Sequence, residues 1–305
     1  MRDDFAVLIL THGRANKVVT MKGVLQAGNY TGKWYMVIDN EDDQADEYIK
    51  RYGREHVVIF DKQAVDDWTD TADTFHEHRA IIYARNQSFY IARELGLKYF
   101  LMLDDDYTGL HHRYIENGHL KAKKCTQLDR LFEDMIEFLE STDAMTVAFC
   151  QAGDFIGGAN GKRFSEKVVR KAMNSFFCRA DRPFQFVGTM NEDVTMYTTL
   201  GSRGALIMSI TDCAIIQAAT QGTKGGMSEA YADGGTFLKS FYSVMSMPSA
   251  VRVEMLNSAH KRIHHKINWT CCVPKILNQR YRKEVQSEWL RATSTEVSSC
   301  SIRGV

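Results

Sequence analysis

The first third of the chain alternates short apolar runs with polar segments of helical spacing. Continuous apolar runs predict strands over residues 5–10, 34–38, 57–60 and 99–103. Between them, the spacing of apolar residues predicts helices over residues 16–27 and 79–95, each closed by a glycine. Strands that alternate with helices form parallel sheets with crossover helices. We therefore expect an α/β fold of the Rossmann type, with a mostly parallel sheet and flanking helices.

The second half of the chain has a less regular pattern, which indicates a mixed sheet. Helical spacing and apolar runs predict helices over residues 127–139 and 191–200, and strands over residues 145–149 and 205–216. Four glycines between residues 153 and 161 predict a hairpin or a wide turn. Asn191 is expected to cap the second of these helices.

Length and composition agree with an enzyme of one large domain or two fused ones. The chain has 305 residues, of which 44% are hydrophobic and 25% charged. No apolar run approaches the roughly 20 residues of a membrane span, and residues 5–10 are too short for a signal peptide, so we expect a cytoplasmic protein without a membrane segment. Lys plus Arg and Asp plus Glu number 38 each, so binding of a polyanion would depend on local charge. The seven cysteines, without a CxxC pair, are expected to be reduced.

Three consecutive carboxylates follow the predicted strand over residues 99–103. Like charges at the end of a buried strand are costly unless a cation shares them. Asp104 and Asp106, two residues apart, are placed to bind one hard divalent ion such as Mn²⁺ or Mg²⁺ through their oxygens. A solvated acidic turn and an aspartate helix cap are the alternatives. An EF-hand is excluded because its glycine and distal glutamate are missing.

Polar residues also lie at the ends of the other predicted elements. Thr11 and Arg14 follow the first strand, Asp39 follows the second, and Arg85 and Asn86 lie on the helix before the acidic triplet. The carboxyl ends of parallel strands share one sheet edge, where α/β proteins bind ligands. Together these side chains suit a nucleotide base, ribose and diphosphate, because arginine forks match phosphate oxygens. Taken one by one, they also fit ordinary caps, turn residues and surface charges.

Glu192 and Asp193 stand in the first turn of the helix predicted over residues 191–200. Carboxylates are stabilised there by the helix dipole, typically by ~0.3 to 1 kcal/mol, so a structural role explains them. The functional alternative is a general base that removes a proton from an acceptor hydroxyl. The sequence leaves both interpretations open.

One stretch near the carboxyl terminus is both basic and aromatic. Its members include Lys266, Lys275, Arg280 and Arg282, with Trp269, Tyr281 and Trp289 interleaved. Lys and Arg side chains contact the phosphates of a nucleic-acid backbone, and aromatic rings can take a base that is extruded from the duplex. A solvated terminal helix with core tryptophans is the alternative.

The motifs of the chain resemble those of a known family. The chain lacks GxxxxGK[ST] and a strand followed by GxGxxG, so neither a P-loop kinase nor a standard dinucleotide site is supported. It is instead similar to GT-A glycosyltransferases in Leu-Thr-His-Gly-Arg after the first strand, Val-Ile-Asp-Asn after the second, Ala-Arg-Asn at 84–86, Leu-Asp-Asp-Asp-Tyr at 103–107 and Asn-Glu-Asp at 191–193. More narrowly, Tyr-Thr-Gly-Lys-Trp-Tyr at 30–35 and Phe-Asp-Lys at 60–62 resemble the TET-associated glycosyltransferases of bacteriophages, over roughly residues 5–217.

The resemblance implies a GT-A-like fold and transfer of a sugar from a nucleotide-sugar donor, a UDP-sugar, to 5-hydroxymethylcytosine in phage DNA. The resemblance also implies that Asp104 and Asp106 bind a divalent metal ion, with His264 of the carboxyl-terminal part as a further ligand. Asp105 joins the donor-binding residues, and the carboxylates of the later helix would face the acceptor. The identity of the sugar and the inverting or retaining outcome stay open.

The implied functional parts are a donor half at residues 1–125, an acceptor half with the basic segment at 126–292, and a flexible tail at 293–305. The first two are expected to be fused into one unit, and no obligate protein partner is indicated. A polysaccharide or protein acceptor is the alternative substrate, and a non-catalytic nucleotide-sugar-binding or DNA-binding module is the alternative class. The segment with His260, His264 and Cys271–Cys272 also admits surface histidines or a structural zinc.

Overall fold

The computed structural model describes residues 1–72, 80–217, 238–256 and 262–274. Its main feature is a ten-stranded sheet in the order β3-β2-β1-β4-β9-β7-β10-β5-β6, with β8 paired to β10. The strands are β1 (Phe5–Leu10), β2 (Lys33–Asp39), β3 (Val57–Phe60), β4 (Tyr99–Asp104), β5 (Tyr107–Glu116), β6 (His119–Lys124), β7 (Ala144–Cys150), β8 (Val168–Val169), β9 (Ser175–Arg179) and β10 (Leu206–Gln217). A separate two-stranded sheet consists of β11 (Val251–Leu256) and β12 (Arg262–Ile267).

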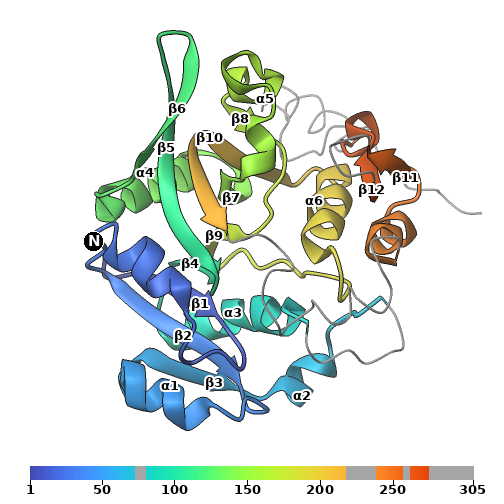
Figure 1. Cartoon of the computed structure of the whole chain (residues 1–305). Helices are drawn as coiled ribbons and strands as arrows, with labels where there is room; N and C mark the ends of the chain where they lie inside the picture. Colours follow the sequence, from blue (N-terminus) through green and yellow to red (C-terminus); the bar gives the residue numbers. More distant parts are fainter. Residues whose placement is uncertain (73–79, 218–237, 257–261, 275–305) are drawn as a thin grey trace, which may run out of the picture.

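Helices cover both faces of the large sheet (Figure 1). The α-helices are α1 (Ala45–Tyr52), α2 (Lys62–Asp66), α3 (Ile82–Glu94), α4 (Leu128–Ser141), α5 (Lys162–Ser165) and α6 (Glu192–Ser202), and residues 238–246 are also helical. The shorter helical turns are η1 (Met21–Gln26), η2 (Arg54–His56), η3 (Ala152–Phe155), η4 (Gly158–Asn160) and η5 (Trp269–Cys271).

Strand pairing confirms the expected α/β fold class. β1 pairs in parallel with β2 and β4, and β2 pairs in parallel with β3. In the second half, β7 and β10 are parallel to each other, whereas β9 and β5 run antiparallel to their neighbours. The sheet is therefore parallel in its first half and mixed in its second. The parallel pairing brings the carboxyl ends of β1, β2, β3 and β4 to one edge.

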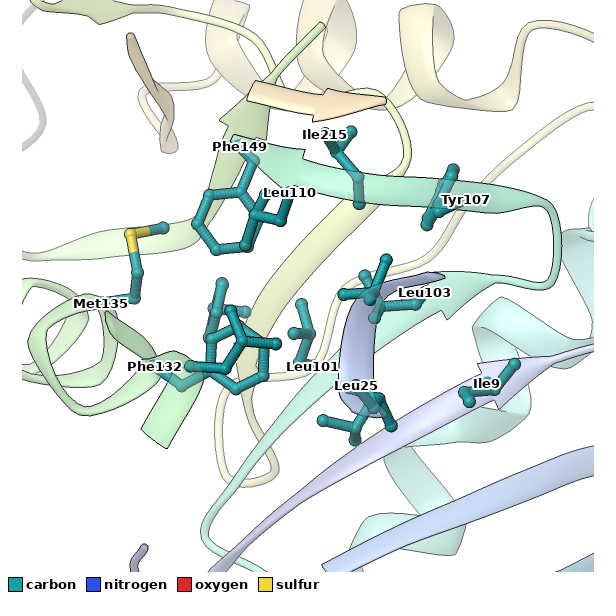
Figure 2. Close-up of a cluster of buried hydrophobic side chains, with 14 of the residues drawn as sticks. Ile9, Leu25, Leu101, Leu103, Tyr107, Leu110, Phe132, Met135, Phe149 and Ile215 are labelled. Carbon is teal, nitrogen blue, oxygen red and sulfur yellow. The ribbon is translucent and has the colours of Figure 1, made fainter. Parts of the chain in front are cut away.

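Alternate residues of the central strands enter two separate cores. The odd-numbered residues of β1 pack with α4 and η1, whereas its even-numbered residues pack with α3 and α6. Figure 2 shows the first core, where Ile9 and Leu101 lie on the same side of the sheet as Phe132 of α4. Because both faces are covered, these strands are continuous apolar runs without alternation. Each fully buried Leu or Phe contributes about 1.5 to 3 kcal/mol, which makes the sheet a rigid base for its carboxyl edge.

The segment after β1 differs from its prediction. The helix expected over residues 16–27 is shorter, because helical residues begin only at 19 and η1 is a π-helical turn. Residues 11–15 form a loop held by side chains of α1, a helix that the sequence pattern did not reveal. Gly23 lets η1 lie against β5, since a Cβ at this position would lie 2.8 Å from the carbonyl oxygens of Tyr107 and Thr108.

Two further predictions of local structure differ from the structure, and one hairpin was not predicted. Of the glycines between residues 153 and 161, Gly153 lies in η3, Gly158 lies in η4, and Gly157 and Gly161 flank η4, so this segment is a series of helical turns and not a hairpin. A hairpin occurs instead at β5 and β6, where β6 is exposed along its length and so carries no apolar alternation. Asn191 precedes α6 but makes no capping bond; its side-chain amide donates to the Lys239 carbonyl oxygen at 2.7 Å and to Ser243 Oγ at 3.2 Å.

Some predictions concern residues that fall beyond the described ranges. Within those ranges, no helix is long and apolar enough to cross a membrane. The six described cysteines form no disulfide, as expected for reduced thiols. Lys275, Arg280 and Arg282 and the tail at 293–305 lie outside the described residues, and so does His260.

Candidate active site

Polar residues converge at the carboxyl edge of the parallel strands. Thr11 follows β1, Asp39 ends β2 and Asp104 ends β4. Leu10, the last residue of β1, lies beside Asp104 on one side and Val37 on the other. The strand order therefore gathers polar side chains that are up to about a hundred residues apart in the sequence. The helices α4 and α6 belong to the two different cores and so lie on opposite faces of the sheet (Figure 1).

Asp105 is buried, and its hydrogen bonds connect the loop after β1 to the acidic triplet. Its carboxylate accepts hydrogen bonds from Thr11 Oγ1 at 2.8 Å and from Arg14 Nη1 at 2.9 Å. Burial raises the pKa of Asp105, and the positive charge of Arg14 opposes that rise. The Tyr48 hydroxyl lies 2.8 Å from Thr11 Oγ1 and accepts the Arg14 backbone N–H at 2.9 Å. This geometry makes Asp105 a positioning residue for Thr11 and Arg14.

Asp39 forms a second charged cluster with His12 and Lys62. His12 Nδ1 lies 2.8 Å from Asp39 Oδ2, and Lys62 Nζ lies 3.0 Å from Asp39 Oδ1. Burial alone would raise the pKa of Asp39, but the hydrogen bond with His12 and the charges of His12 and Lys62 hold it below its ordinary value. The bond to Asp39 raises the pKa of His12. The buried carboxylate therefore stays ionised beside a half-exposed imidazole.

Arg85 is buried on α3 and links the acidic triplet to α6. Its Nη2 lies 3.2 Å from Asp104 Oδ1, and its Nη1 donates to Glu192 Oε1. The guanidinium carbon lies 5.1 Å and 5.5 Å from the ring centroids of Phe176 and Phe186. Burial opposes the charge, yet the two carboxylates hold the pKa of Arg85 above its ordinary value. Both terminal nitrogens of Arg85 are thus paired inside the protein, and donor binding by Arg85 stays a prediction.

Asn86, the next residue on α3, also makes its hydrogen bonds within the protein. Its amide accepts the Phe186 backbone N–H at 2.8 Å and donates to the Phe186 carbonyl oxygen at 3.1 Å. These two bonds fix the segment that leads through Gly188 into α6. Asn86 therefore holds the segment before α6, and donor binding by Asn86 stays a prediction.

Glu192 and Asp193 occupy the first turn of α6 and differ in their partners. Glu192 is paired with Arg85, whereas Asp193 forms no ion pair with any described residue. Burial raises the pKa of Glu192 to about 7, with Arg85 opposing the rise and Asp193 adding to it. Burial also raises the pKa of Asp193. A helix N-terminus by itself would lower both pKa values, so burial outweighs the helix dipole at these two carboxylates. Carboxylates of this kind are matched to proton abstraction near neutral pH.

Asp104 and Asp106 differ in how the protein satisfies them. Asp104 accepts from Arg85 and from the Tyr107 hydroxyl, which lies 2.8 Å from its Oδ2. Asp106 accepts from Gln217 Nε2, which lies 3.2 Å and 3.0 Å from its two oxygens. Burial raises the pKa of Asp106, Gln217 opposes the rise and the negative charge of Asp104 adds to it. A carboxylate held by a neutral amide and repelled by a second carboxylate fits a hard divalent cation.

His264 lies on β12, which contacts the start of α6. The rings of His264 and His265 have centroids 4.2 Å apart, and Asn191 Nδ2 lies 3.4 Å from His265 Nδ1. Over the described ranges, Asp104, Asp106 and His264 do not bring three ligand atoms within 4.8 Å of one another. Ligation of the metal by His264 therefore stays a prediction.

The predicted nucleic-acid-binding residues are described only in part. Lys266 is exposed on β12, and its Nζ lies 2.8 Å from Glu254 Oε2. The three other cations of that prediction lie beyond residue 274, outside the described chain. Lys266 is the one member whose surroundings are known, and it is available at the surface with a single carboxylate neighbour at ion-pair distance.

Several site residues were missed by sequence reasoning. Lys62 follows β3 and Gln217 ends β10, so the strand-end rule that identified Asp39 also applies to them. Tyr107 follows the acidic triplet directly, and its hydroxyl contacts Asp104. Tyr48 had no such signal, because it belongs to α1 and reaches the loop after β1 only through the folded structure.

Comparison with known proteins gives one family. The family model described as TET-Associated Glycosyltransferase matches residues 5–226. No curated protein matches the chain.

Solved structures show more distant likenesses. A mycobacterial protein is similar with a TM-score of 0.45 and 10% identity, over 86% of this chain and 83% of that one. Glucosyl-3-phosphoglycerate synthase from Mycobacterium tuberculosis, in complex with Mg²⁺ and uridine diphosphate, is similar with a TM-score of 0.43 and 12% identity, over 86% and 87% of the two chains. The same synthase with Mn²⁺, uridine diphosphate and phosphoglyceric acid has a TM-score of 0.42 and 12% identity, over 86% of each chain. At these TM-scores the likenesses do not bear on donor or metal.

Proposed function

The chain belongs to the TET-associated glycosyltransferase family and is a glycosyltransferase, and on that premise we propose that it moves a sugar from a UDP-sugar to 5-hydroxymethylcytosine in phage DNA. The observation that carries the proposal is the bridge made by Arg85. One buried guanidinium joins Asp104 of the acidic triplet to Glu192 of α6. Donor and acceptor groups are thereby held at a fixed separation, which is what group transfer requires.

The donor half is proposed to comprise residues 1–125. Thr11 and Arg14 are pre-positioned by Asp105, and Arg14 adds a partly exposed guanidinium that matches a diphosphate. Asp39, ionised between His12 and Lys62, suits the hydroxyl or N–H donors of the nucleoside. These groups bind and orient the donor.

A divalent ion, Mn²⁺ or Mg²⁺, is proposed to bind Asp106 and Asp104. When bound, such an ion supplies Lewis-acid stabilisation of the charge on the departing nucleoside diphosphate. The protein contributes Gln217 and Tyr107, which orient the two carboxylates, and Arg85, which limits the repulsion between Asp104 and its neighbours.

The acceptor half is proposed to comprise residues 126–292, with Glu192 or Asp193 acting on the hydroxymethyl group. A carboxylate at this position removes the hydroxyl proton in an inverting reaction, or orients the hydroxyl and stabilises positive charge on the sugar in a retaining one. The nearly neutral pKa of Glu192 leaves a large fraction of it ionised at physiological pH. DNA as acceptor is supported by the family and by the basic stretch from Lys266 onward, and a DNA substrate of a phage enzyme lies in the host cytoplasm.

The proposal is tested by incubating the protein with hydroxymethylated DNA and a panel of nucleotide sugars, with Mn²⁺ present, and measuring the mass of the modified nucleoside. We expect one added hexose on 5-hydroxymethylcytosine with a UDP-sugar, and none on matched unmodified DNA. Transfer to a free glycan or to a protein with no transfer to DNA would overturn the acceptor assignment and favour the alternative substrate class.

Neutralising the basic stretch is expected to weaken DNA binding without changing base preference. Phosphate contacts release counterions, so each of Lys266→Gln, Lys275→Gln, Arg280→Gln and Arg282→Gln should flatten the slope of log affinity against log salt by roughly 0.7 to 0.9. The preference for hydroxymethylated DNA should survive, because phosphate contacts position the duplex and do not read the base. Binding isotherms over a salt series measure this effect.

Arg130→Gln on the exposed face of α4 is the matched control and should leave the salt slope unchanged. A wild-type affinity that does not depend on salt would exclude phosphate contact by this stretch.

A further inference from the structure

A cluster of three metal-ligating side chains lies outside the candidate active site. His112 belongs to β5, Cys213 to β10, and Cys125 directly follows β6. Their ligand atoms all lie within 4.8 Å of one another, and over the described ranges they are the one group of three or more His, Cys, Asp and Glu ligands that meets this distance. Two paired strands and the residue after a third strand thus each supply one ligand.

The sheet register explains why the three side chains meet. Cys213 lies directly opposite His112 in the antiparallel β5–β10 pair. The Cys125 backbone N–H donates to the Leu110 carbonyl oxygen at 2.8 Å, which continues the β5–β6 pairing by one residue. Residues 110 and 112 share a face of β5 because side chains alternate along a strand. Cys125, His112 and Cys213 therefore project from the same face of the sheet.

The distance between Cys213 and His112 fits two ligands of one tetrahedral ion. Cys213 Sγ lies 3.6 Å from His112 Nδ1. Ligands at ~2.3 Å for sulfur and ~2.0 to 2.1 Å for nitrogen, separated by a tetrahedral angle, are roughly 3.6 Å apart. Both cysteines are buried, whereas His112 is exposed. An ion held here would be shielded on the side of the thiolates and open to water on the side of the imidazole.

We propose that His112, Cys125 and Cys213 bind a zinc ion, with water as the fourth ligand. The two thiols lose their protons on binding, and the resulting charge of two thiolates balances that of Zn²⁺. The donor set of two sulfurs and one nitrogen favours zinc over the hard cations that suit Asp104 and Asp106, so the two sites select different metals.

The proposed ion would link β5 and β10, the two strands that also carry Tyr107 and Gln217 of the candidate active site. Cys213 lies four residues before Gln217, and His112 lies five residues after Tyr107. Gln217 and Tyr107 contact the carboxylates of Asp106 and Asp104. Fixing β10 and β5 together therefore fixes the strands that orient the acidic triplet.

The test is a metal analysis of the full-length chain, purified with a non-thiol reductant, followed by replacement of zinc with cobalt. We expect one zinc per chain, and with Co²⁺ the visible bands of a tetrahedral ion together with thiolate-to-cobalt charge transfer. Cys125→Ser, Cys213→Ser and His112→Gln should each lose most of the bound metal, and wild type should melt at a higher temperature with Zn²⁺ than after chelation.

Two matched variants control for loss of metal that is caused by disturbed folding. His111→Gln alters the neighbouring histidine, whose side chain alternates to the other face of β5, and Cys271→Ser alters a half-buried cysteine outside the cluster; both should keep the metal. Absence of zinc and of cobalt charge-transfer bands in folded wild type would overturn the proposal, and so would a Cys125–Cys213 disulfide in the purified chain. Metal content is measured independently of sugar transfer, so this result does not depend on the proposed function.

Discussion

Asp106→Asn is expected to lower sugar transfer by at least about 100-fold while the chain stays folded. The amide keeps the shape of the side chain and one oxygen that accepts from Gln217 Nε2, but it removes the charge proposed to bind the divalent ion. A 100-fold loss corresponds to about 3 kcal/mol of transition-state stabilisation, which is within the range of a Lewis-acid metal. The measurement is kcat with hydroxymethylated DNA, together with donor affinity in the presence and absence of Mn²⁺.

Two comparisons make this result specific. Asp134→Asn, exposed on α4, should be indistinguishable from wild type. Asp105→Asn should lower the melting temperature, because Asp105 holds Thr11 and Arg14 through buried contacts. Excess chelator should abolish wild-type activity, and added Mn²⁺ or Mg²⁺ should restore it. Full activity of Asp106→Asn, or of wild type in chelator, would remove the metal from the mechanism.

Glu192→Gln and Asp193→Asn are expected to show which of these two carboxylates is the general base. The variant that loses the base should bind donor normally and turn over about 10² to 10⁴-fold more slowly, since the lost interaction belongs to the transition state. Glu192→Gln should also lower the melting temperature, because it leaves the buried Arg85 with one carboxylate fewer. Asp193 has no ion pair with a described residue, so Asp193→Asn should leave stability nearly unchanged.

The pH dependence of kcat identifies which carboxylate acts. Burial raises the pKa of Glu192 to about 7 and the active form is ionised, so activity should fall as the pH drops through about 7. Asp193 contributes to this raised value, so Asp193→Asn should move the acid limb to lower pH if Glu192 is the base. Unchanged turnover in both variants would return these residues to a structural role at the helix N-terminus.

The sequence by itself determined the parallel half of the sheet and the place of the acidic triplet. Strands that are buried on both faces carry unbroken apolar runs, so their bounds were predicted almost to the residue at 5–10 and 99–103. The strand-end rule then located Asp39, Thr11 and Asp104 at one edge. These inferences succeed because they depend on local composition and on the fixed direction of parallel strands.

The tertiary structure decided what each polar group does at that edge. Arg85 and Asn86 have the residue types expected of donor ligands, but their partners, Glu192 and Phe186, are 107 and 100 residues away. Those contacts give both residues a role in positioning α6 that their local sequence does not reveal. The nearly neutral pKa of Glu192 likewise arises from burial, which depends on packing against distant elements and has no local signature.

The same limit applies to the proposed zinc site. His112, Cys125 and Cys213 have none of the short spacing that marks metal ligands in a sequence, and His112 and Cys213 are 101 residues apart. They meet because β10 pairs with β5 in one particular register, whereas a shift by one residue would turn Cys213 to the opposite face. Local pattern therefore fixed the strands and their polar ends, and the long-range register and burial that come only with folding fixed the partners, charges and ligands.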